Sequence, residues 1–199
     1  LRGMGFSEIW VVQEPGPGAR QPRIRLVDEE YHDLLISGAQ GVLALPAAAG
    51  KPLRVNDQPY RGVVEILVTP GRDLQAVNIL GLEEYLRGVV PREMGPTVYP
   101  ELEALKAQAV AARTYLEANR GQFSEDGFDI CDSARCQVYG GMAAEHPLTD
   151  FAVEQTAGLV ATWEGRPINA LYTSTCGGHT EDVGNVFREM QGAYLKGAL

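Results

Sequence analysis

Cysteine is rare in this sequence, with three residues among 199: Cys131, Cys136 and Cys176. Three cysteines are too few for the dense cross-linking that holds small secreted domains together. Their spacing also lacks the paired C-x-x-C pattern of a structural zinc site. The odd count leaves at least one thiol free if a bridge forms. Because so few cross-links are possible, we expect an apolar core to stabilise the fold.

Basic charge and long apolar runs are scarce as well. Seventeen Lys and Arg residues against 26 Asp and Glu residues give a net charge of -9. That charge repels a phosphate backbone and no local basic patch offsets it, so the sequence predicts no binding to nucleic acid. The longest apolar candidate, GVLALPAAAG at 41–50, is broken by Pro46 and is shorter than the roughly 18 residues of a membrane span. The sequence begins at Leu1 without a signal peptide, and we expect a fragment from which a targeting segment has been removed.

The residues that are present predict a folded protein that starts with strands. Hydrophobic residues make up 45% and charged residues 22% of the chain, a composition typical of one or two globular domains. The first part alternates short apolar runs with turn-forming residues such as EPGPG and TPGRD, which indicates a β-rich region. The expected strands lie at 6–12, 23–27, 34–38, 41–45, 52–55, 62–68 and 74–80.

Near residue 81 the apolar spacing becomes helical. A short helix over 82–90 should end where Pro91 interrupts it. A longer helix within 99–121 should have Pro100 at its first helical position and stop at Arg120 and Gly121. Because this helix has an apolar stripe and many alanines, we expect it to be buried. The stripe consists of Leu102, Leu105, Ala109, Ala112 and Leu116.

The last part of the sequence predicts a helix over 146–158 and a hairpin of two strands within 159–175, around the turn EGRP. Strands first and helices mainly later favour an α+β fold. We expect a β-rich N-terminal part followed by a mixed part with a buried Ala-rich helix. The proposed boundary separates a segment at 1–58 from a domain at 59–199, and the two can form one compact unit.

The stretch GVVPREMGP, residues 88–96, holds a single acid, Glu93, between Pro91 and Pro96. A capping or surface carboxylate and a catalytic acid or base both fit this position. Rigid flanking prolines and a nearby helix with cations favour a carboxylate whose proton affinity is set by its surroundings, as acid–base catalysis needs. Glycoside hydrolysis normally uses two carboxylates, and no other acid has so constrained a setting. A reaction with one proton shuttle fits better.

Other candidate site residues also have a structural alternative. Lys106 and Arg113 share a helix face, and we favour ion pairing within the core over substrate contact for both. Gln137 and Tyr139 are compatible with a strand end or with a sugar-binding edge. The loop STCGGHTE at 174–181 permits close approach of a ligand. A Cys176–His179 nucleophile pair is an alternative there, although the sequence identifies no third residue to orient it.

Three blocks of the sequence, in order and spacing, strongly resemble the SpoIID/LytB family of bacterial cell-wall proteins. They are GLEEYLRGVVPREM with YPELEALKAQAVAARTYL, then FDICDSARCQVYGG, then STCGGHTE. The similarity covers roughly residues 59–195. It implies a lytic transglycosylase that cleaves the β-1,4 bond between N-acetylmuramic acid and N-acetylglucosamine in peptidoglycan strands without stem peptides.

In that family the glutamate of the P-x-E-M motif is the catalytic acid and base, a position that corresponds to Glu93. The C6 hydroxyl of the sugar closes a 1,6-anhydro ring, so no second carboxylate is needed. The resemblance also implies an extracytoplasmic location and a cell-wall amidase as a partner. A non-catalytic, glycan-binding enhancer of that amidase is the alternative function. Our candidates for contact with the glycan are Arg92, Lys106, Gln108, Arg113, Gln137, Tyr139, Ser174, Thr175, Cys176, Gly177, Gly178 and His179.

Some members of the family hold zinc through the cysteine pair that corresponds to Cys131 and Cys136, with a histidine directly before the second cysteine. Arg135 occupies that position here, and arginine cannot replace an imidazole ligand. We therefore predict no zinc at this pair and no cofactor. A Cys131–Cys136 bridge is the alternative that an extracytoplasmic location would permit.

Overall fold

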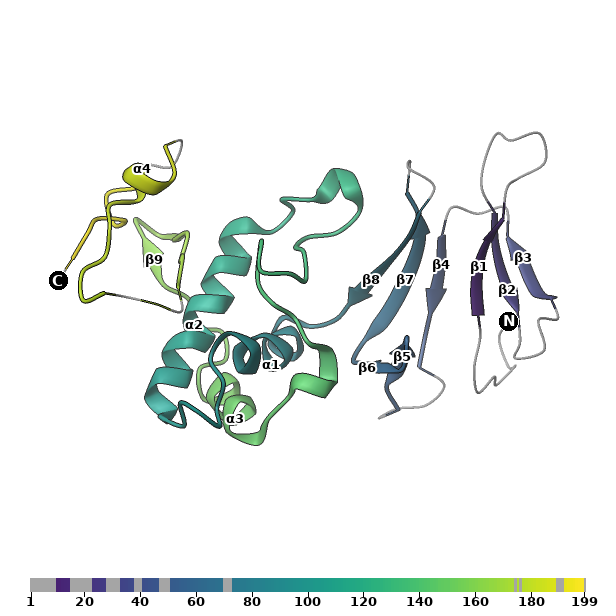
Figure 1. The fold of residues 1–199 in the computed structure, drawn as a ribbon, viewed down its shortest axis with the longest axis horizontal. Coiled ribbons are helices and arrows are strands. Elements are labelled where there is room, and N and C mark those ends of the chain that lie inside the picture. Colours follow the sequence, from purple (N-terminus) through teal and green to yellow (C-terminus); the bar gives the residue numbers. More distant parts are fainter. Residues whose placement is uncertain are drawn as a thin grey trace. The chain divides into compact units, whose positions relative to one another are not determined.

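The computed structural model describes residues 10–14, 23–27, 33–37, 41–46, 51–69, 73–173, 175, 177–188 and 192–198. The chain divides into two compact units. The first comprises Leu1–Tyr85, Ser124–Phe128 and Gly141–Ala143, and the second comprises Leu86–Phe123, Asp129–Gly140 and Ala144–Leu199. Strands dominate the first unit and helices the second (Figure 1), which confirms the α+β class. The expected boundary at residue 58 stays a prediction.

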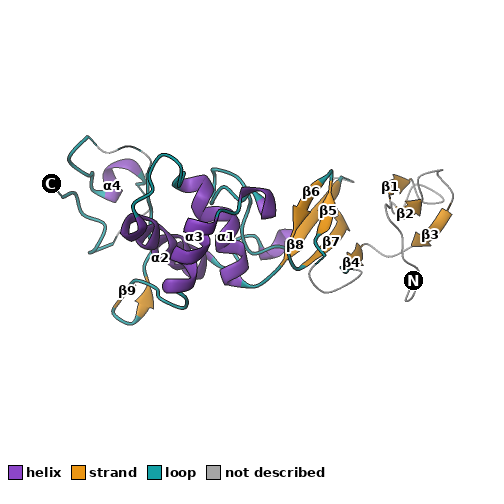
Figure 2. Ribbon diagram, turned by 90° about the horizontal axis from the view of Figure 1, so that it is seen from below, coloured by secondary structure: helices purple, strands orange, loops and turns teal. Residues whose placement is uncertain are grey.

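The first unit contains antiparallel sheets. One sheet has the order β1-β2-β3, and a second has the order β4-β7-β8. A separate hairpin pairs β5 with β6; Figure 2 shows the strands in orange. The strands are β1 (Trp10–Glu14), β2 (Arg23–Val27), β3 (Asp33–Ser37), β4 (Gly41–Ala44), β5 (Leu53–Val55), β6 (Gln58–Tyr60), β7 (Val63–Val68) and β8 (Leu74–Ile79).

Strand β6 was not expected from the sequence, because its first residues belong to VNDQP, a run of turn formers. Asn56 and Asp57 have φ angles of 48° and 65°, the left-handed conformation that a two-residue hairpin turn requires of its central positions. The turn is therefore confined to these residues, and Gln58 already pairs with Val55. The other predicted strands are confirmed within a few residues, except that residues 6–9 lie outside the described residues.

Helices follow along the chain. They are α1 (Leu82–Glu93), α2 (Leu102–Asn119), α3 (Pro147–Gln155) and α4 (Val183–Val186), with short 3-10 helices at Ser124–Asp126 and Gly141–Ala144. The predicted hairpin is present but short, because β9 (Thr162–Trp163) and β10 (Arg166–Pro167) are two residues each. Its turn residues Glu164 and Gly165 have positive φ angles. None of the helices in the described residues combines the length and the apolar composition of a membrane span.

Two expected helix boundaries were wrong. Helix α1 does not end before Pro91 but includes it and continues to Glu93. Proline removes only the bond to the carbonyl one turn back, and the Met94 N–H still donates to the Val90 carbonyl at 2.9 Å. Helix α2 begins at Leu102 after the extended residue Glu101, so Pro100 precedes the helix and is not its first residue. The predicted C-terminal end of α2 is confirmed, because the helix ends at Asn119 and Gly121 has a φ of +78°.

The buried face of α2 forms part of the core of the second unit. Leu105, Ala109 and Ala112 are fully buried, and the small alanines allow neighbouring elements to approach closely. Ala107, on another face, is exposed, so the helix is buried along one side and not all round as expected. Leu86, Val89 and Val90 of α1 and Ala152 and Val153 of α3 complete the apolar core.

Two polar side chains of α2 organise the chain after α3. The fully buried Arg113 donates through Nη1 to the Leu159 carbonyl at 3.0 Å and through Nη2 to the Val153 carbonyl at 3.5 Å. The Thr114 hydroxyl accepts the Ala161 N–H at 2.9 Å. Because buried backbone polar groups must be paired, these bonds fix the path of residues 153–161 against α2.

Replacing Arg113 with methionine should destabilise the protein by about 2–4 kcal/mol, because it leaves buried carbonyls without their charged donor. Lys106→Met, on the same helix, should cost less than about 0.5 kcal/mol, because the ion pair of Lys106 with the exposed Glu103 is a surface pair. Urea unfolding measures both changes. Equal losses for the two variants would contradict the structural role of Arg113.

Candidate functional site around Glu93

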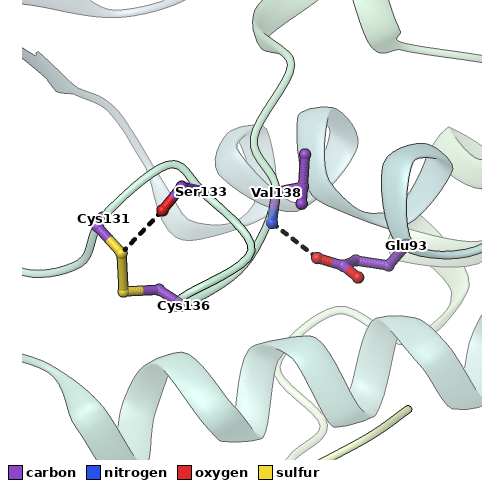
Figure 3. The surroundings of a disulfide bond; sticks show 5 residues. All are labelled: Glu93, Cys131, Ser133, Cys136 and Val138. Carbon is purple, nitrogen blue, oxygen red and sulfur yellow. Dashed lines mark hydrogen bonds between the residues drawn. A yellow bond between two sulfur atoms is a disulfide. The ribbon is translucent and has the colours of Figure 1, made fainter. Parts of the chain in front are cut away.

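Glu93 is the last residue of α1, and its side chain is half-buried. The carboxylate oxygen Oε1 accepts a hydrogen bond from the backbone N–H of Val138 at 2.7 Å. Figure 3 shows the side chain extending from the helix end toward the segment that carries Val138. Bonds to an ionised acceptor are short and strong. The carboxylate is therefore held by the backbone of a segment that is 45 residues away in sequence.

Residues 137–140 connect α1 with α2. The buried Gln137 side chain donates to the Ala112 carbonyl of α2 at 3.1 Å, and the Gly140 N–H donates to the Gly88 carbonyl of α1 at 3.0 Å. A Cβ at position 140 would lie 2.6 Å from the Ala144 Cβ and 3.2 Å from the stem of Arg92. Only glycine fits this close approach, so the glycine in CQVYGG is needed to place the amide that binds Glu93.

Tyr172 joins the same cluster through Gln137, although it was not among the residues predicted for the site. Its hydroxyl accepts a hydrogen bond from Gln137 Nε2 at 3.0 Å, and its ring lies edge-on to Tyr115, with centroids 6.4 Å apart. Burial raises the pKa of Tyr172 far above its usual range; the hydrogen bond from Gln137 opposes this, and the negative charge of Glu93 raises the pKa further. Tyr172 therefore stays neutral and can act as a donor. Its one sequence signal is its place just before the STCGG loop.

The structure separates the other predicted contacts into core and surface positions. Arg92 is exposed, Lys106 pairs with Glu103 at 2.8 Å, and Arg113 belongs to the core. Tyr139 is half-buried, and its N–H donates to the Asp132 carbonyl. Gln108 is buried, and its Nε2 has no hydrogen-bond partner within the described part of the chain. Of these candidates, Gln137 and Tyr139 flank Val138, the residue whose backbone N–H binds Glu93.

The loop STCGGHTE is only partly described. Ser174 and Cys176 lie outside the described residues, so the Cys176–His179 pair stays a prediction. Thr175, Gly177, Gly178 and His179 are exposed. The loop is anchored at its end, where the Thr180 N–H donates to the Ala198 carbonyl at 2.8 Å. In the sequence, Tyr172 precedes the loop by two residues.

Cys131 and Cys136 form a disulfide. The bridge closes a turn in which the Cys136 N–H donates to the Ser133 carbonyl, next to the segment that binds Glu93 (Figure 3). Arg135 points to the Phe123 ring, with its guanidinium carbon 5.3 Å from the ring centroid. A disulfide leaves no thiolates for a metal and arginine is not a ligand, so these residues do not fit the zinc site that some family members have.

Removing the bridge should loosen the chain just before Gln137. The double variant Cys131→Ser/Cys136→Ser should lose about 2 kcal/mol of stability, the loop entropy that a bridge over so short a loop removes from the unfolded chain. Thermal unfolding with and without reductant measures this loss. If the wild type does not respond to reductant and matches the double variant, the bridge has no stabilising role.

Comparison with known proteins gives the same assignment for the region that contains Glu93. A family model described as stage II sporulation protein, SpoIID, matches residues 71–163. The chain is 44% identical over 102 residues to the amidase enhancer of Bacillus subtilis, which covers 51% of this chain and 13% of that protein. It is 40% identical over 124 residues to stage II sporulation protein D of Bacillus subtilis, which covers 55% of this chain and 36% of that protein.

An uncharacterised protein of Brachyspira hyodysenteriae is 40% identical over 115 residues, which make up 56% of this chain and 30% of that protein. The chain thus spans 13–36% of the length of these three relatives. The family match includes Glu93 and Val138, which are joined by the hydrogen bond described above, and it includes Gln137 directly before Val138. This chain therefore belongs to the SpoIID family.

Proposed function

We propose that this chain is a lytic transglycosylase that cleaves the β-1,4 bond between N-acetylmuramic acid and N-acetylglucosamine in peptidoglycan strands. Glu93 is its acid and base. The observation that carries this proposal is the half-buried carboxylate of Glu93, which accepts a hydrogen bond from the Val138 amide at 2.7 Å. Such fixation keeps an acid in one geometry throughout the reaction, and correct positioning of the proton donor contributes to catalysis together with its acidity.

The hydrogen bond to Oε1 determines where the proton of Glu93 is held. Because Oε1 already accepts the Val138 N–H, the proton is carried by Oε2, the other carboxyl oxygen. Oε2 gives this proton to the glycosidic oxygen as the bond to C1 of the muramic acid breaks. The negative charge that remains on the carboxylate is stabilised by the Val138 amide.

The second half of the reaction uses the substrate. Glu93 now accepts the proton of the C6 hydroxyl, and the O6 atom forms the new bond to C1, which closes the 1,6-anhydro ring. The proton that left Glu93 is thereby replaced, and no water is consumed. Hydrolysis would require a second carboxylate to act as nucleophile or to activate water. The Glu93 carboxylate accepts from a neutral group, the Val138 amide N–H, which fits the single-acid route.

An extracytoplasmic location follows from this substrate. The Cys131–Cys136 disulfide supports it, since structural disulfides persist mainly in oxidising compartments.

The groups that we propose contact the glycan are Arg92, which is exposed next to Glu93, and the loop after Tyr172. Arg113 is excluded from direct contact by its burial.

Glu93→Gln should lose at least about 100-fold in activity, because the amide cannot donate and accept the proton in turn. Denuded glycan strands are incubated with each protein, and 1,6-anhydro ends are counted by mass spectrometry. Glu84→Gln, which changes an exposed carboxylate of the same helix, is the matched control and should keep wild-type activity. Full activity of Glu93→Gln would show that Glu93 is not the acid.

The similarity to the amidase enhancer favours a second candidate function. In that case the chain binds glycan and stimulates a partner amidase without cutting the strand itself. Binding would then occur without new anhydro ends, and stimulation of the amidase would survive Glu93→Gln. Measuring both products in one reaction separates the two functions.

A further inference from the structure

We propose that the Cys131–Cys136 disulfide is a redox-sensitive positioning element for Glu93. While the bridge is closed, it holds the Val138 amide against the Glu93 carboxylate. When a dithiol reduces the bridge, that amide loses its fixed direction and the carboxylate loses its donor. The catalytic consequence rests on the proposed transglycosylase function, whereas the coupling itself rests on the hydrogen bonds made by residues 131–140.

The turn that the bridge closes has little else to hold it in place. Residues 132–135, all within the described part of the chain, are exposed and form neither helix nor strand. Inside the turn, the Cys136 N–H donates to the Ser133 carbonyl at 2.9 Å, and Arg135 lies over the Phe123 ring. Both are surface interactions, which stabilise little because water competes for the groups involved. The covalent bond between the cysteines is therefore the main constraint on the turn.

One backbone hydrogen bond connects this turn to the donor of Glu93. The Asp132 carbonyl, inside the ring that the bridge closes, accepts the Tyr139 N–H at 3.1 Å. The preceding amide, that of Val138, donates to Glu93 Oε1 at 2.7 Å. Because each peptide unit is planar, only the two dihedral angles of Val138 separate these two amides. A movement of the turn therefore changes the direction in which the Val138 N–H points.

Two further contacts keep the segment in place when the bridge opens. The Gln137 side chain donates to the Ala112 carbonyl of α2 at 3.1 Å, and the Gly140 N–H donates to the Gly88 carbonyl of α1 at 3.0 Å. Neither contact involves a residue of the turn. Reduction should therefore loosen the amides between these two contacts without detaching the segment from the helices. The protein stays folded while its proposed catalytic carboxylate loses a fixed donor.

The reduction is a thiol–disulfide exchange. A thiolate of the dithiol attacks one cysteine sulfur, the S–S bond breaks, and the other cysteine leaves as a thiolate that takes up a proton. The second thiol of the dithiol then displaces the first cysteine from the mixed disulfide. Two electrons and two protons pass to Cys131 and Cys136, and the dithiol becomes a cyclic disulfide. Both cysteines are half-buried at the ends of an exposed turn, within reach of a small dithiol.

The coupling is tested by NMR of the backbone amides in the oxidised protein and in protein reduced with dithiothreitol. The Val138 amide proton, held downfield by its short bond to a carboxylate, should move upfield on reduction. In Glu93→Ala, which lacks the acceptor, it should lie upfield in both states. The Ala161 amide, which donates to the Thr114 hydroxyl, is the control and should not move.

A Val138 signal that stays downfield after complete reduction would overturn the proposal. An equal movement of the Ala161 signal would also overturn it, because the bridge would then affect the whole domain and not the donor of Glu93. Complete reduction is verified by alkylation of the thiols and mass spectrometry. These measurements need no enzymatic activity, so they decide the coupling even if the chain proves to be an amidase enhancer.

The kinetic test compares the oxidised and the reduced enzyme on denuded glycan strands. Reduction should lower kcat at least about tenfold, as expected for one lost bond to a charged group. KM should stay within about twofold, because the bridge acts on the acid and not on the sugar. Reoxidation should restore kcat. The double variant Cys131→Ser/Cys136→Ser should have the low kcat and should not respond to dithiothreitol.

Cys176→Ser controls for the third cysteine, and reduction should lower its kcat by the same factor as in the wild type. Loss of this response in Cys176→Ser would show that the dithiol acts through Cys176 and would contradict the proposal. An unchanged kcat of the fully reduced wild type, or a loss confined to KM, would contradict it as well. Failure of the oxidised wild type to cleave glycan would count against the proposed function alone.

Discussion

The hydrogen bond from the Val138 amide to Glu93 is the interaction on which the site depends. It requires α1 to continue through Pro91 as far as Glu93. It also requires Val138, 45 residues away in sequence, to lie at the helix end, with its amide nitrogen 2.7 Å from Glu93 Oε1. Gly140 makes that passage possible because a side chain there would collide with Ala144. A backbone donor cannot rotate away as a side chain can. The carboxylate is therefore held by the fold itself.

The buried polar groups of α2 also help to place the segments that surround the site. Arg113 and Thr114 fix the chain after α3, and the Ala112 carbonyl fixes Gln137. Burying such groups costs free energy unless each one is paired, and these pairs are made with backbone atoms of other segments. The Ala-rich sequence of the helix allows those segments to come close enough. The buried polar groups of α2 thus determine where the neighbouring segments lie, and the apolar residues of the same region stabilise the fold.

Much of the fold could be predicted because local sequence determines it. Apolar alternation located most strands, and Gly121 correctly marked the end of α2. Local rules failed at Pro91, where the helix tolerates the residue near its end, and at Asn56 and Asp57, where a tight turn leaves room for β6. At the candidate site, Glu93 and Gln137 were selected from their motifs, and their functional roles stay predictions. Tyr172 was missed because its role depends on a contact with Gln137, 35 residues away in sequence, which no local pattern reveals.

The central claim is that one fixed carboxylate suffices because the substrate supplies the nucleophile. Digestion of denuded glycan strands in water enriched in oxygen-18, with mass analysis of the new ends, tests this most directly. Intramolecular attack by the C6 hydroxyl predicts anhydro ends that contain no oxygen-18. Reducing ends that incorporate oxygen-18 from the solvent would show hydrolysis and would contradict the claim.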